Sequence, residues 1–328
     1  MDVYRSLAQI DPCIPGPSAV ALGYFDGVHM GHQKVLCSTA AFASIMTPCV
    51  FTFSHLAKKG ATILSAEAKF DAFREIGFQV VVSLDFPEVR GLSPEQFIHE
   101  VLIERMGARV VCCGNNFHFG RDAAGNLDFL IRECDKAGVS VLTAGQVTYS
   151  DELISSTAIR RAISQGKMET VRRMMGRPYS IDFEVIHGNE LGRTLEFPTI
   201  NQAFPAGFCV PAFGVYASVA RVDGQYLPAV TNVGVKPTVG SDRILGETHI
   251  VNCDKDLYGQ RIQVFLLEHL REETRFPSVE KLKEQMVKDR ERAVEISRNA
   301  IAQGDWYFHI FHGGSGEGLR SWTGNGDY

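Results

Sequence analysis

The first half of the chain alternates short apolar runs with stretches whose apolar residues recur at helical spacing. The apolar runs predict strands at residues 19–23, 48–53, 80–84, 109–113 and 139–143. The helical spacing predicts helices over residues 33–45 and 65–76, from Ser93 onward, and over 127–136. Such alternation predicts a parallel sheet covered on both faces, with ligands at the carboxyl ends of its strands.

The second half changes character, because short apolar strands follow one another with turns between them. Strands are predicted at residues 179–186, 214–222, 225–235, 247–252 and 263–270. Asp223 and Gly224 form a hairpin turn signal. An antiparallel barrel or sandwich is therefore expected. A closing helix follows, with an apolar stripe made of Leu282, Met286, Ala293 and Ile296.

The length of 328 residues suggests two domains, each large enough for its own core. The predicted boundary falls at residues 176–178, which gives domains of 1–177 and 178–303. Residues 304–328 form a tail rich in glycine and aromatic residues, to which no structure or role is assigned.

Composition and charge exclude several classes of protein. The chain is 45% apolar and 22% charged, which excludes an intrinsically disordered protein. Its net charge of −5 argues against a nucleic-acid binder that depends on bulk positive charge. No apolar run approaches the ~20 residues that cross a bilayer, and the first ten residues do not resemble a secretory signal. The charge and the apolar pattern do not indicate an oligomeric state.

The eight cysteines include no Cys-x-x-Cys pair and no histidine at zinc spacing. Their use as small apolar residues is favoured over a disulfide framework or a metal site. The adjacent Cys112 and Cys113 lie in a predicted strand, so their side chains should point to opposite faces. Reduced cysteines predict a cytoplasmic location.

The string GYFDGVHMGH at residues 23–32 joins the first strand to the first helix. A helix beginning near His32 would point free N–H groups at an anion, and Gly27 and Gly31 allow a close approach. His29 and His32 share one face of the first turn and can reach one phosphate together. The alternative interpretation of an isolated His-x-x-His is a pair of capping or core histidines.

Two further segments carry polar groups that suit phosphates. Residues 154–160, ISSTAIR, combine hydroxyl groups that cap a helix with Arg160 on the same face. Taken alone, Ser-Ser-Thr is an ordinary capping sequence. Residues 188–201, GNELGRTLEFPTIN, place Thr199 and Asn201 on one side of an extended segment. Their oxygens suit Mg²⁺ held jointly with ATP phosphates, although an exposed edge strand is the alternative.

The first half resembles the His-x-x-His nucleotidylyltransferases, in the form found in bacterial FAD synthetases. The resemblance rests on residues 23–32, on GNNFHFG at 114–120 and on residues 154–160. It implies a Rossmann-like α/β domain that transfers AMP from ATP to FMN, with His29 and His32 as catalytic residues. It also implies ATP-binding roles for Gly23, Phe25, Gly27, Gly31, Asn116, Ser156, Thr157 and Arg160.

The second half resembles riboflavin kinase, and the motifs follow in the family's order. They are residues 188–201, PAFGVYA at 211–217, TNVGVKPT at 231–238, ETHI at 247–250, DLYG at 256–259 and LREETRF at 270–276. The resemblance implies an antiparallel β-barrel with a closing helix. It implies Glu247 as catalytic base, Thr199 and Asn201 as Mg²⁺ ligands, Gly188, Gly192 and Arg193 at ATP, and Arg271 and Tyr216 at the flavin. A surface ion pair with Arg243 or Lys236 is the alternative for Glu247.

Three departures from the two families matter. Residues 52–57, TFSHLA, stand where the first family has Thr-Phe-Asp-Pro-His-Pro, and Asn115 stands where an acid is common. Glu196 replaces a usual glycine and should weaken ATP binding modestly. Together the two resemblances imply a bifunctional enzyme that makes FMN from riboflavin and FAD from FMN, using ATP and Mg²⁺. The alternatives are a riboflavin kinase with a decayed first domain and a non-catalytic flavin-binding regulator.

Overall fold

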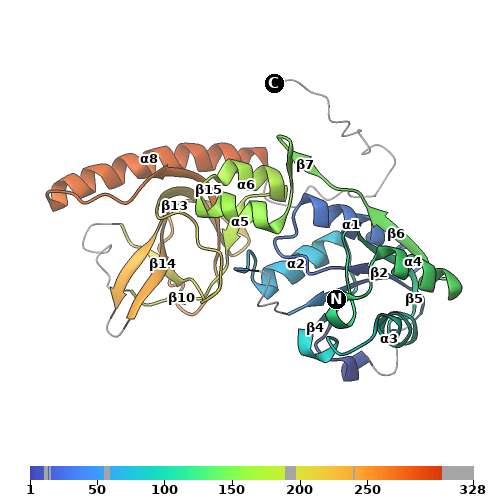
Figure 1. Ribbon diagram of the computed structural model, residues 1–328. Helices are drawn as coiled ribbons and strands as arrows, with labels where there is room; N and C mark the ends of the chain where they lie inside the picture. The colour runs from blue at the N-terminus through green and yellow to red at the C-terminus, as the bar shows by residue number, and fades with distance from the viewer. Residues whose placement is uncertain (11–13, 15, 55–59, 189–196, 239–240, 305–328) are drawn as a thin grey trace.

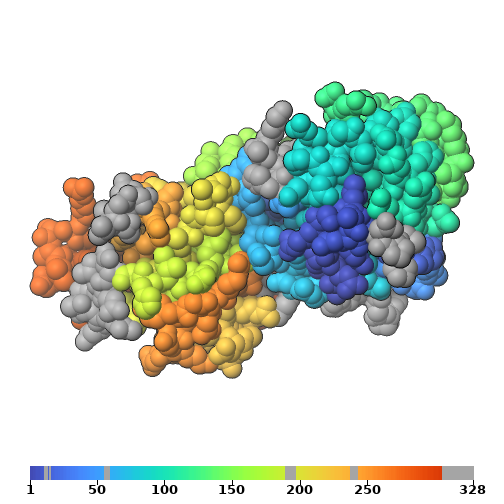
Figure 2. Space-filling model, turned by 90° about the horizontal axis from the view of Figure 1, so that it is seen from below, coloured from blue at the N-terminus to red at the C-terminus, as the bar shows by residue number. Residues whose placement is uncertain are grey.

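A computed structural model describes residues 1–10, 14, 16–54, 60–188, 197–238 and 241–304. The chain forms two lobes, which Figure 1 shows as a sheet with surrounding helices and a second sheet lying beneath a long helix. The space-filling view from below shows the same two lobes side by side (Figure 2). None of the helices in the described ranges is both long and apolar enough to cross a membrane.

The first lobe is built on a parallel sheet, as predicted, but the sheet has six strands because residues 2–4 add an edge strand that the sequence did not predict. Its strands are β1 (Asp2–Tyr4), β2 (Ser18–Leu22), β3 (Thr47–Phe53), β4 (Val80–Leu84), β5 (Ala108–Gly114) and β6 (Ser140–Ala144). They lie in the order β1-β4-β3-β2-β5-β6. The chain therefore moves outward from β2 in one direction to β3 and β4, then returns to start again at β5 on the other side of β2.

Helices cover both faces of this sheet. They are α1 (Met30–Ala40), α2 (Ala66–Ile76), α3 (Pro94–Gln96), the π-helix η4 (Phe97–Arg105) and α4 (Leu127–Lys136). Alternate residues of β2 enter different cores: Ala19 and Ala21 pack on the face of α1 and α2, while Val20 and Leu22 pack on the face of η4 and α4. The predicted capping box before α3 is present, with Ser93 and Gln96 bonded reciprocally.

The cysteines behave as small apolar residues. Cys112 packs into the core on one face of the first sheet and Cys113 into the core on the other, as their alternation in β5 predicts. The seven cysteines in the described ranges are free thiols. Burial raises the pKa of Cys49 and of Cys113 to about 12, which keeps both thiols protonated and unreactive at neutral pH.

Helices α5 (Ser156–Ser164) and α6 (Met168–Met175) follow a two-stranded ribbon, β7 (Thr148–Tyr149) and β8 (Glu152–Leu153). The two helices lie between the lobes in Figure 1. Gly176 ends α6 in the left-handed conformation, with φ of 71°. The next strand starts at Tyr179 and belongs to the second sheet. The division into domains at residue 177 stays a prediction.

The second lobe is a seven-stranded antiparallel sheet with the order β10-β11-β14-β13-β12-β15-β9. Its strands are β9 (Tyr179–Ile181), β10 (Val185–Ile186), β11 (Ile200–Ala203), β12 (Gly214–Val222), β13 (Gln225–Thr238), β14 (Ser241–Ile250) and β15 (Gln263–Arg271). The two edge strands, β9 and β10, are joined through residues 182–184 alone. A three-residue link between the edges requires the sheet to curl round toward a barrel.

The closing helix α8 (Val279–Gln303) packs along β12, β13 and β15. The residues that α8 buries differ from the apolar stripe that the sequence predicts. Asp289, Ala293 and Ser297 are its buried residues, four positions apart, whereas Leu282, Met286 and Ile296 are partly exposed. The polar residues are tolerated because each has a partner: Asp289 accepts from Arg271, and Ser297 donates to the Ser218 carbonyl at 2.7 Å.

Candidate active sites

The first candidate site lies where the order of strands in the parallel sheet reverses. Strand β2 neighbours both β3 and β5, and the loops after β2 and β5 leave the same edge of the sheet. The carboxyl ends of strands at such a reversal form a crevice for ligands. Residues 23–29 and 115–126 fill these two loops. The predicted histidine and asparagine motifs therefore meet at one place, which we call the first site.

His29 and His32 stack on each other at the start of α1. Their ring centroids lie 3.5 Å apart with 17° between the planes. Nδ1 of His29 accepts a hydrogen bond from the backbone N–H of His32 at 3.3 Å, so His29 is the N-cap. The helix therefore begins at Met30, earlier than predicted, because an imidazole replaces the usual capping side chains. The capping interpretation is correct, and it does not exclude a phosphate contact.

Both imidazoles are neutral at physiological pH. Burial, followed by the positive charges of Arg177 and Arg160, lowers the pKa of His29 to about 4. Burial and the neighbouring His29 lower the pKa of His32 well below its usual range. Nδ1 of His32 is buried and has no hydrogen-bond partner among the described residues. A neutral ring with a free nitrogen at a helix N-terminus can form a hydrogen bond with a ligand.

The backbone of the motif loop adopts rare conformations. Phe25 and Val28 have φ of 54° and 40°, which side chains of their size seldom adopt. Gly27 has φ of 83°, which glycine adopts without steric strain because it has no Cβ. A Cβ on Gly23 would lie 2.8 Å from the Phe25 ring, and one on Gly31 would lie 3.3 Å from the His29 ring. The glycines therefore leave room for the aromatic and imidazole rings.

Arg160 reaches the first site from α5. Its guanidinium lies 2.5 Å from Oδ2 of Asp26, and its Nε donates to the Ala61 carbonyl at 2.5 Å. Ser156 Oγ donates to the Asp26 carbonyl at 2.9 Å, whereas Thr157 is exposed. Ser155 rather than Ser156 caps α5, by accepting from the Ala158 N–H. The segment thus lies against the histidine loop.

Asn116 lies in the exposed loop after β5. Its backbone carbonyl contacts Nδ1 of His118 at 3.0 Å, so the imidazole donates this bond. A Cβ on Gly114 would lie 3.3 Å from the Asn116 Oδ1, which shows how closely the side chain folds over the end of β5. The structure thus places Asn116 beside the crevice. The ATP-binding roles predicted for Asn116 and for the residues above stay predictions.

Two buried cations lie at the first site although no sequence motif assigned them a role there. Arg177 is 6% exposed, and it donates to the Gly27 carbonyl at 3.0 Å and to the Val28 carbonyl at 3.3 Å. Burial lowers its pKa to about 9, so it remains charged at neutral pH. Lys69 on α2 is also 6% exposed. The sequence did contain a signal for Lys69, because this lysine lies on the apolar face of the helix predicted at residues 65–76.

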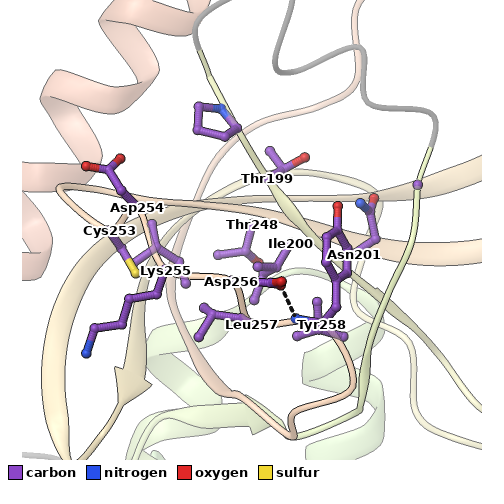
Figure 3. Close-up of a pocket in the computed structure, with 14 residues that line it drawn as sticks. Thr199, Ile200, Asn201, Thr248, Cys253, Asp254, Lys255, Asp256, Leu257 and Tyr258 are labelled. Carbon is purple, nitrogen blue, oxygen red and sulfur yellow. Dashed lines mark hydrogen bonds between the residues drawn. The ribbon is translucent and has the colours of Figure 1, made fainter.

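The second candidate site is a pocket of about 210 Å³ at the start of β11. Thr199 and Asn201 line it together with the segment 253–258 (Figure 3), and their role as Mg²⁺ ligands stays a prediction. The turn in that segment is held by a bond from the Tyr258 N–H to Asp256 Oδ1 at 3.1 Å. We call this pocket the second site.

Gly188 and Asn201 are packed so closely that a Cβ at residue 188 would displace the Asn201 side chain. A Cβ on Gly188 would lie 2.7 Å from Cγ of Asn201, whose side chain is nearly buried. His249 donates to the Pro198 carbonyl at 2.9 Å and so fixes the segment that carries Thr199. Two oxygen-bearing side chains held in place beside a pocket fit the demands of a Mg²⁺ ion shared with phosphates.

Glu247 lies on β14 directly opposite Asn201 on β11. Side chains of directly opposed residues share one face of a sheet, so the carboxylate lies on the same face as the Asn201 amide. Its Oε2 pairs with Lys236 Nζ at 2.9 Å, and its side chain is 26% exposed. The ion pair that the sequence offered as an alternative is therefore present. It leaves Glu247 partly open to solvent, and the role as catalytic base stays a prediction.

The two predicted flavin residues have well-defined partners. Arg271 donates to both carboxylate oxygens of Asp289 at 2.8–3.2 Å and so ties β15 to α8. Tyr216 is fully buried and donates to the Ala212 carbonyl at 2.5 Å, so it packs in the core. Their flavin contacts stay predictions. Gly192, Arg193, Glu196 and His55 lie outside the described residues.

Other residues of the second site had no assigned role in the sequence analysis. Asp254, Lys255 and Asp256 line the pocket, but the ammonium group of Lys255 pairs with Asp223, which is not a lining residue. Tyr258 stacks on His187 with centroids 3.8 Å apart and 22° between the rings. The motif DLYG at 256–259 was the available signal for this segment.

Two family models match the chain, one on each lobe. The model described as FAD synthetase matches residues 12–158, and the model described as riboflavin kinase matches residues 175–297. Bifunctional riboflavin kinase/FMN adenylyltransferases of Bacillus subtilis and Pseudomonas fluorescens are 34% and 35% identical to the chain. Each alignment covers 86% of the chain and 93–94% of the relative.

The chain belongs to the bifunctional riboflavin kinase/FMN adenylyltransferase family. The Escherichia coli member is 29% identical over 90% of the chain and 98% of its own length. Family membership confirms the predicted fold class and both resemblances. The departures at residues 54 and 115 are therefore variations within a family member. Asn115 is exposed beside Asn116 in the loop after β5.

A solved structure described as a macrolide-efflux protein from Streptococcus pneumoniae has the same overall architecture. It superposes with a TM-score of 0.79 at 28% identity, over 89% of the chain and 98% of its own length. The match extends across both lobes of this family member.

Proposed function

We propose that the second lobe phosphorylates riboflavin to FMN with ATP, and that the first lobe joins FMN and ATP to give FAD and pyrophosphate. The observation that carries the proposal is that each lobe holds a separate candidate site: the histidine motif lies within the match to the FAD synthetase model, and the pocket with Thr199 and Asn201 lies within the match to the riboflavin kinase model. The names of the relatives support this pair of activities over a kinase with a decayed first domain and over a non-catalytic regulator.

In the kinase reaction, the ribityl 5′-hydroxyl must lose a proton as it attacks the γ-phosphorus. Glu247 is the carboxylate placed to accept that proton, on the sheet face that also carries Asn201. Thr199 and Asn201 would hold Mg²⁺, which neutralises charge on the ATP phosphates when bound. Gly188 leaves room for the Asn201 side chain, because a Cβ at residue 188 would lie 2.7 Å from Asn201 Cγ.

In the adenylyl-transfer reaction, a phosphate oxygen of FMN attacks the α-phosphorus of ATP and pyrophosphate leaves. The acceptor is already a competent nucleophile, so no covalent enzyme intermediate is needed. The N-terminus of α1 and the neutral His29 and His32 offer hydrogen bonds to the phosphoryl oxygens. Arg160 and Arg177 add positive charge beside them. Catalysis here consists of positioning and charge stabilisation.

The cellular location, the binding partners and the metal ion of these reactions remain proposals. We infer a cytoplasmic location, which the free thiols of the described cysteines support. Riboflavin, FMN and ATP are the proposed small-molecule partners, and nucleic acid is not expected to bind. Use of Mg²⁺ rests on the oxygen donors of the second site.

One incubation tests the two activities together. The protein is mixed with riboflavin, ATP and Mg²⁺, and the flavins are resolved by chromatography. Formation of both FMN and FAD is expected. FMN without FAD would leave a kinase alone, and the absence of both would leave a flavin-binding regulator.

Two variants then assign the sites. Glu247→Gln should abolish FMN formation and spare FAD formation from supplied FMN, because it removes a proton acceptor of the second site alone. His29→Ala should have the opposite effect. Matched controls are Glu284→Gln and His99→Ala, which change exposed residues on α8 and η4. Loss of both activities in a folded Glu247→Gln or His29→Ala protein would contradict separate sites.

A further inference from the structure

Lys69 occupies a core position on α2. The buried residues of this helix are Lys69, Phe70, Ala72, Phe73 and Ile76. Lysine is the only charged residue among them, and it is 6% exposed. An apolar side chain at this position would pack without the cost of burying an ammonium group. A buried cation on an apolar helix face therefore requires a specific reason.

The ammonium group of Lys69 lies at the edge of the parallel sheet that carries the first site. Its Nζ donates to the Phe53 carbonyl at 3.0 Å and contacts Thr52 Oγ1 at 3.5 Å, at the carboxyl end of β3. It also lies 5.1 Å from the centre of the Tyr24 ring, in the loop between β2 and α1. Lys69 thus joins the ends of two adjacent strands, on the side where the histidine motif begins.

The charge of Lys69 reaches the histidine pair. Its positive charge is one of the causes that lower the pKa of His32. Among the described residues, Lys69 forms no ion pair. Asp26 acts on it from a greater distance, and that carboxylate already accepts from Arg160 and from the Ile63 N–H. Within the part of the chain that the structure describes, no carboxylate therefore neutralises the positive charge on Lys69 by direct contact.

An anion would complete this arrangement. A buried ammonium group that has carbonyl and hydroxyl partners, and no adjacent carboxylate, is solvated incompletely. The first site binds two phosphate-bearing substrates in the function proposed above. Their phosphates would enter at the strand ends where Lys69, the histidines and the α1 N-terminus converge.

We propose that Lys69 is a further substrate-binding residue of the adenylyl-transfer site, whose ammonium group contacts a phosphate oxygen of ATP or of FMN. The inference rests on the proposed adenylyl-transfer function. Lys69 remains protonated throughout and forms no bond to the substrate, so its contribution is a charge-assisted hydrogen bond. Burial lowers its pKa to about 8, so the group is still charged at neutral pH.

The experiment compares Lys69→Met and Lys69→Arg with the wild type. FAD formation from supplied FMN and ATP is measured while each substrate is varied in turn. Riboflavin phosphorylation by the same preparations serves as the internal control. Lys136→Met is the matched control, because Lys136 on α4 is exposed and pairs with Glu133.

Lys69→Met should raise KM for one substrate by at least about tenfold, since a charge-assisted hydrogen bond is lost. A rise for ATP alone assigns the contact to the nucleotide, and a rise for FMN alone assigns it to the flavin phosphate. Lys69→Arg should restore most of the affinity because it keeps the charge. Kinase activity should stay within about twofold of the wild type in all variants.

A folded Lys69→Met protein with the KM values and kcat of the wild type would overturn the proposal, and so would a loss of kcat alone that arginine does not restore. If Lys69→Met does not fold, Lys69→Gln replaces it under the same criteria. Wild-type FAD formation tests the proposed function itself. The ratio of the KM of the variant to the KM of the wild type tests the role of Lys69. A failure of the proposed function and a failure of the Lys69 proposal can therefore be told apart.

Discussion

The guanidinium of Arg160 lies 2.5 Å from the carboxylate of Asp26, although 134 residues separate them in the chain. Asp26 belongs to the histidine loop and is 3% exposed, while the Arg160 side chain is 17% exposed. Asp26 also accepts from the Ile63 N–H at 2.9 Å, and Arg160 donates to the Ala61 carbonyl. The pair therefore connects α5, the histidine loop and residues 61–63 beside the first site.

Replacing Asp26 by asparagine should release Arg160 from its fixed position. The amide can still accept from the Ile63 N–H, but it offers no charge to the guanidinium. We expect kcat/KM for FAD formation to fall by at least about tenfold, and stability to fall by about 3 kcal/mol, because a nearly buried ion pair loses one partner. Steady-state kinetics and denaturant unfolding measure the two effects.

The control for this variant is Asp71→Asn, which removes an exposed carboxylate paired with Arg74. Exposed pairs contribute little, so this change should alter stability by less than about 1 kcal/mol. Unchanged FAD formation in Asp26→Asn would show that the reaction does not depend on the ion pair between Asp26 and Arg160.

Acid should destabilise the protein partly through His29. Its pKa is about 4 in the folded chain and 6.5 as a free side chain. Between these values the unfolded chain binds the proton and the folded chain does not, so stability falls as pH drops from 6.5 toward 4. His29→Asn keeps a capping side chain without a titrating group. It should therefore lose roughly 3 kcal/mol less than the wild type across this window.

Urea unfolding at several pH values measures this difference. His99→Asn is the control, because His99 is an exposed residue of η4. Equal slopes of stability against pH in the wild type and in His29→Asn would show that protonation of His29 is not coupled to unfolding.

Adding one methyl group at Gly188 should impair the kinase reaction alone. The new Cβ would lie 2.7 Å from Cγ of Asn201, so the amide must move away from its position at the pocket. We expect KM for ATP with Mg²⁺ in FMN formation to rise by about tenfold in Gly188→Ala, with FAD formation unchanged.

Gly91→Ala is the matched control for that change. No atom lies within 4 Å of a Cβ at Gly91, so this substitution meets open space. Wild-type kinetics in Gly188→Ala would show that the Asn201 side chain is not needed in its observed position.

Asp289→Asn should loosen the contact between α8 and β15. Asp289 is 8% exposed and holds the Arg271 guanidinium through two oxygens. We expect a loss of about 2 kcal/mol in stability, because a largely buried arginine loses its charged partner. If Arg271 contacts the flavin as predicted, KM for riboflavin should rise while KM for FMN in the first lobe does not.

Thermal unfolding and kinase kinetics test this prediction, with Glu284→Gln as an exposed control on the same helix. A loss of stability without any change in KM for riboflavin would make Arg271 a structural residue alone. No loss of stability would contradict the importance of the ion pair.

Many elements of the fold follow from local patterns in the sequence. The strand predicted at residues 80–84 has those bounds, and the helix predicted from Ser65 is capped by the Ser65 hydroxyl. These predictions succeed because apolar periodicity and capping depend on nearby residues. The helix predicted at residues 33–45 lies instead at Met30–Ala40. Its cap is an imidazole, which the usual preferences for serine, threonine, aspartate and asparagine do not cover.

The buried residues of α8 also differ from those that the sequence predicts. Periodicity selects apolar residues, yet the buried positions include Asp289 and Ser297. Their burial depends on Arg271 and on the Ser218 carbonyl, which belong to the barrel. A pattern within one helix contains no information about partners on other strands.

The sequence by itself determined the alternation of strands and helices, the change to antiparallel strands after residue 178, and the motifs that mark the two candidate sites. Only the tertiary structure decided which charges meet at those sites. Lys69 comes near His32 because the neighbouring parallel strands β2 and β3 end at one edge of the sheet. Asp26 meets Arg160 because α5 packs against the histidine loop that follows β2. The energy of each charge depends on burial and on partners that are distant in the chain, and these are properties of the packed molecule.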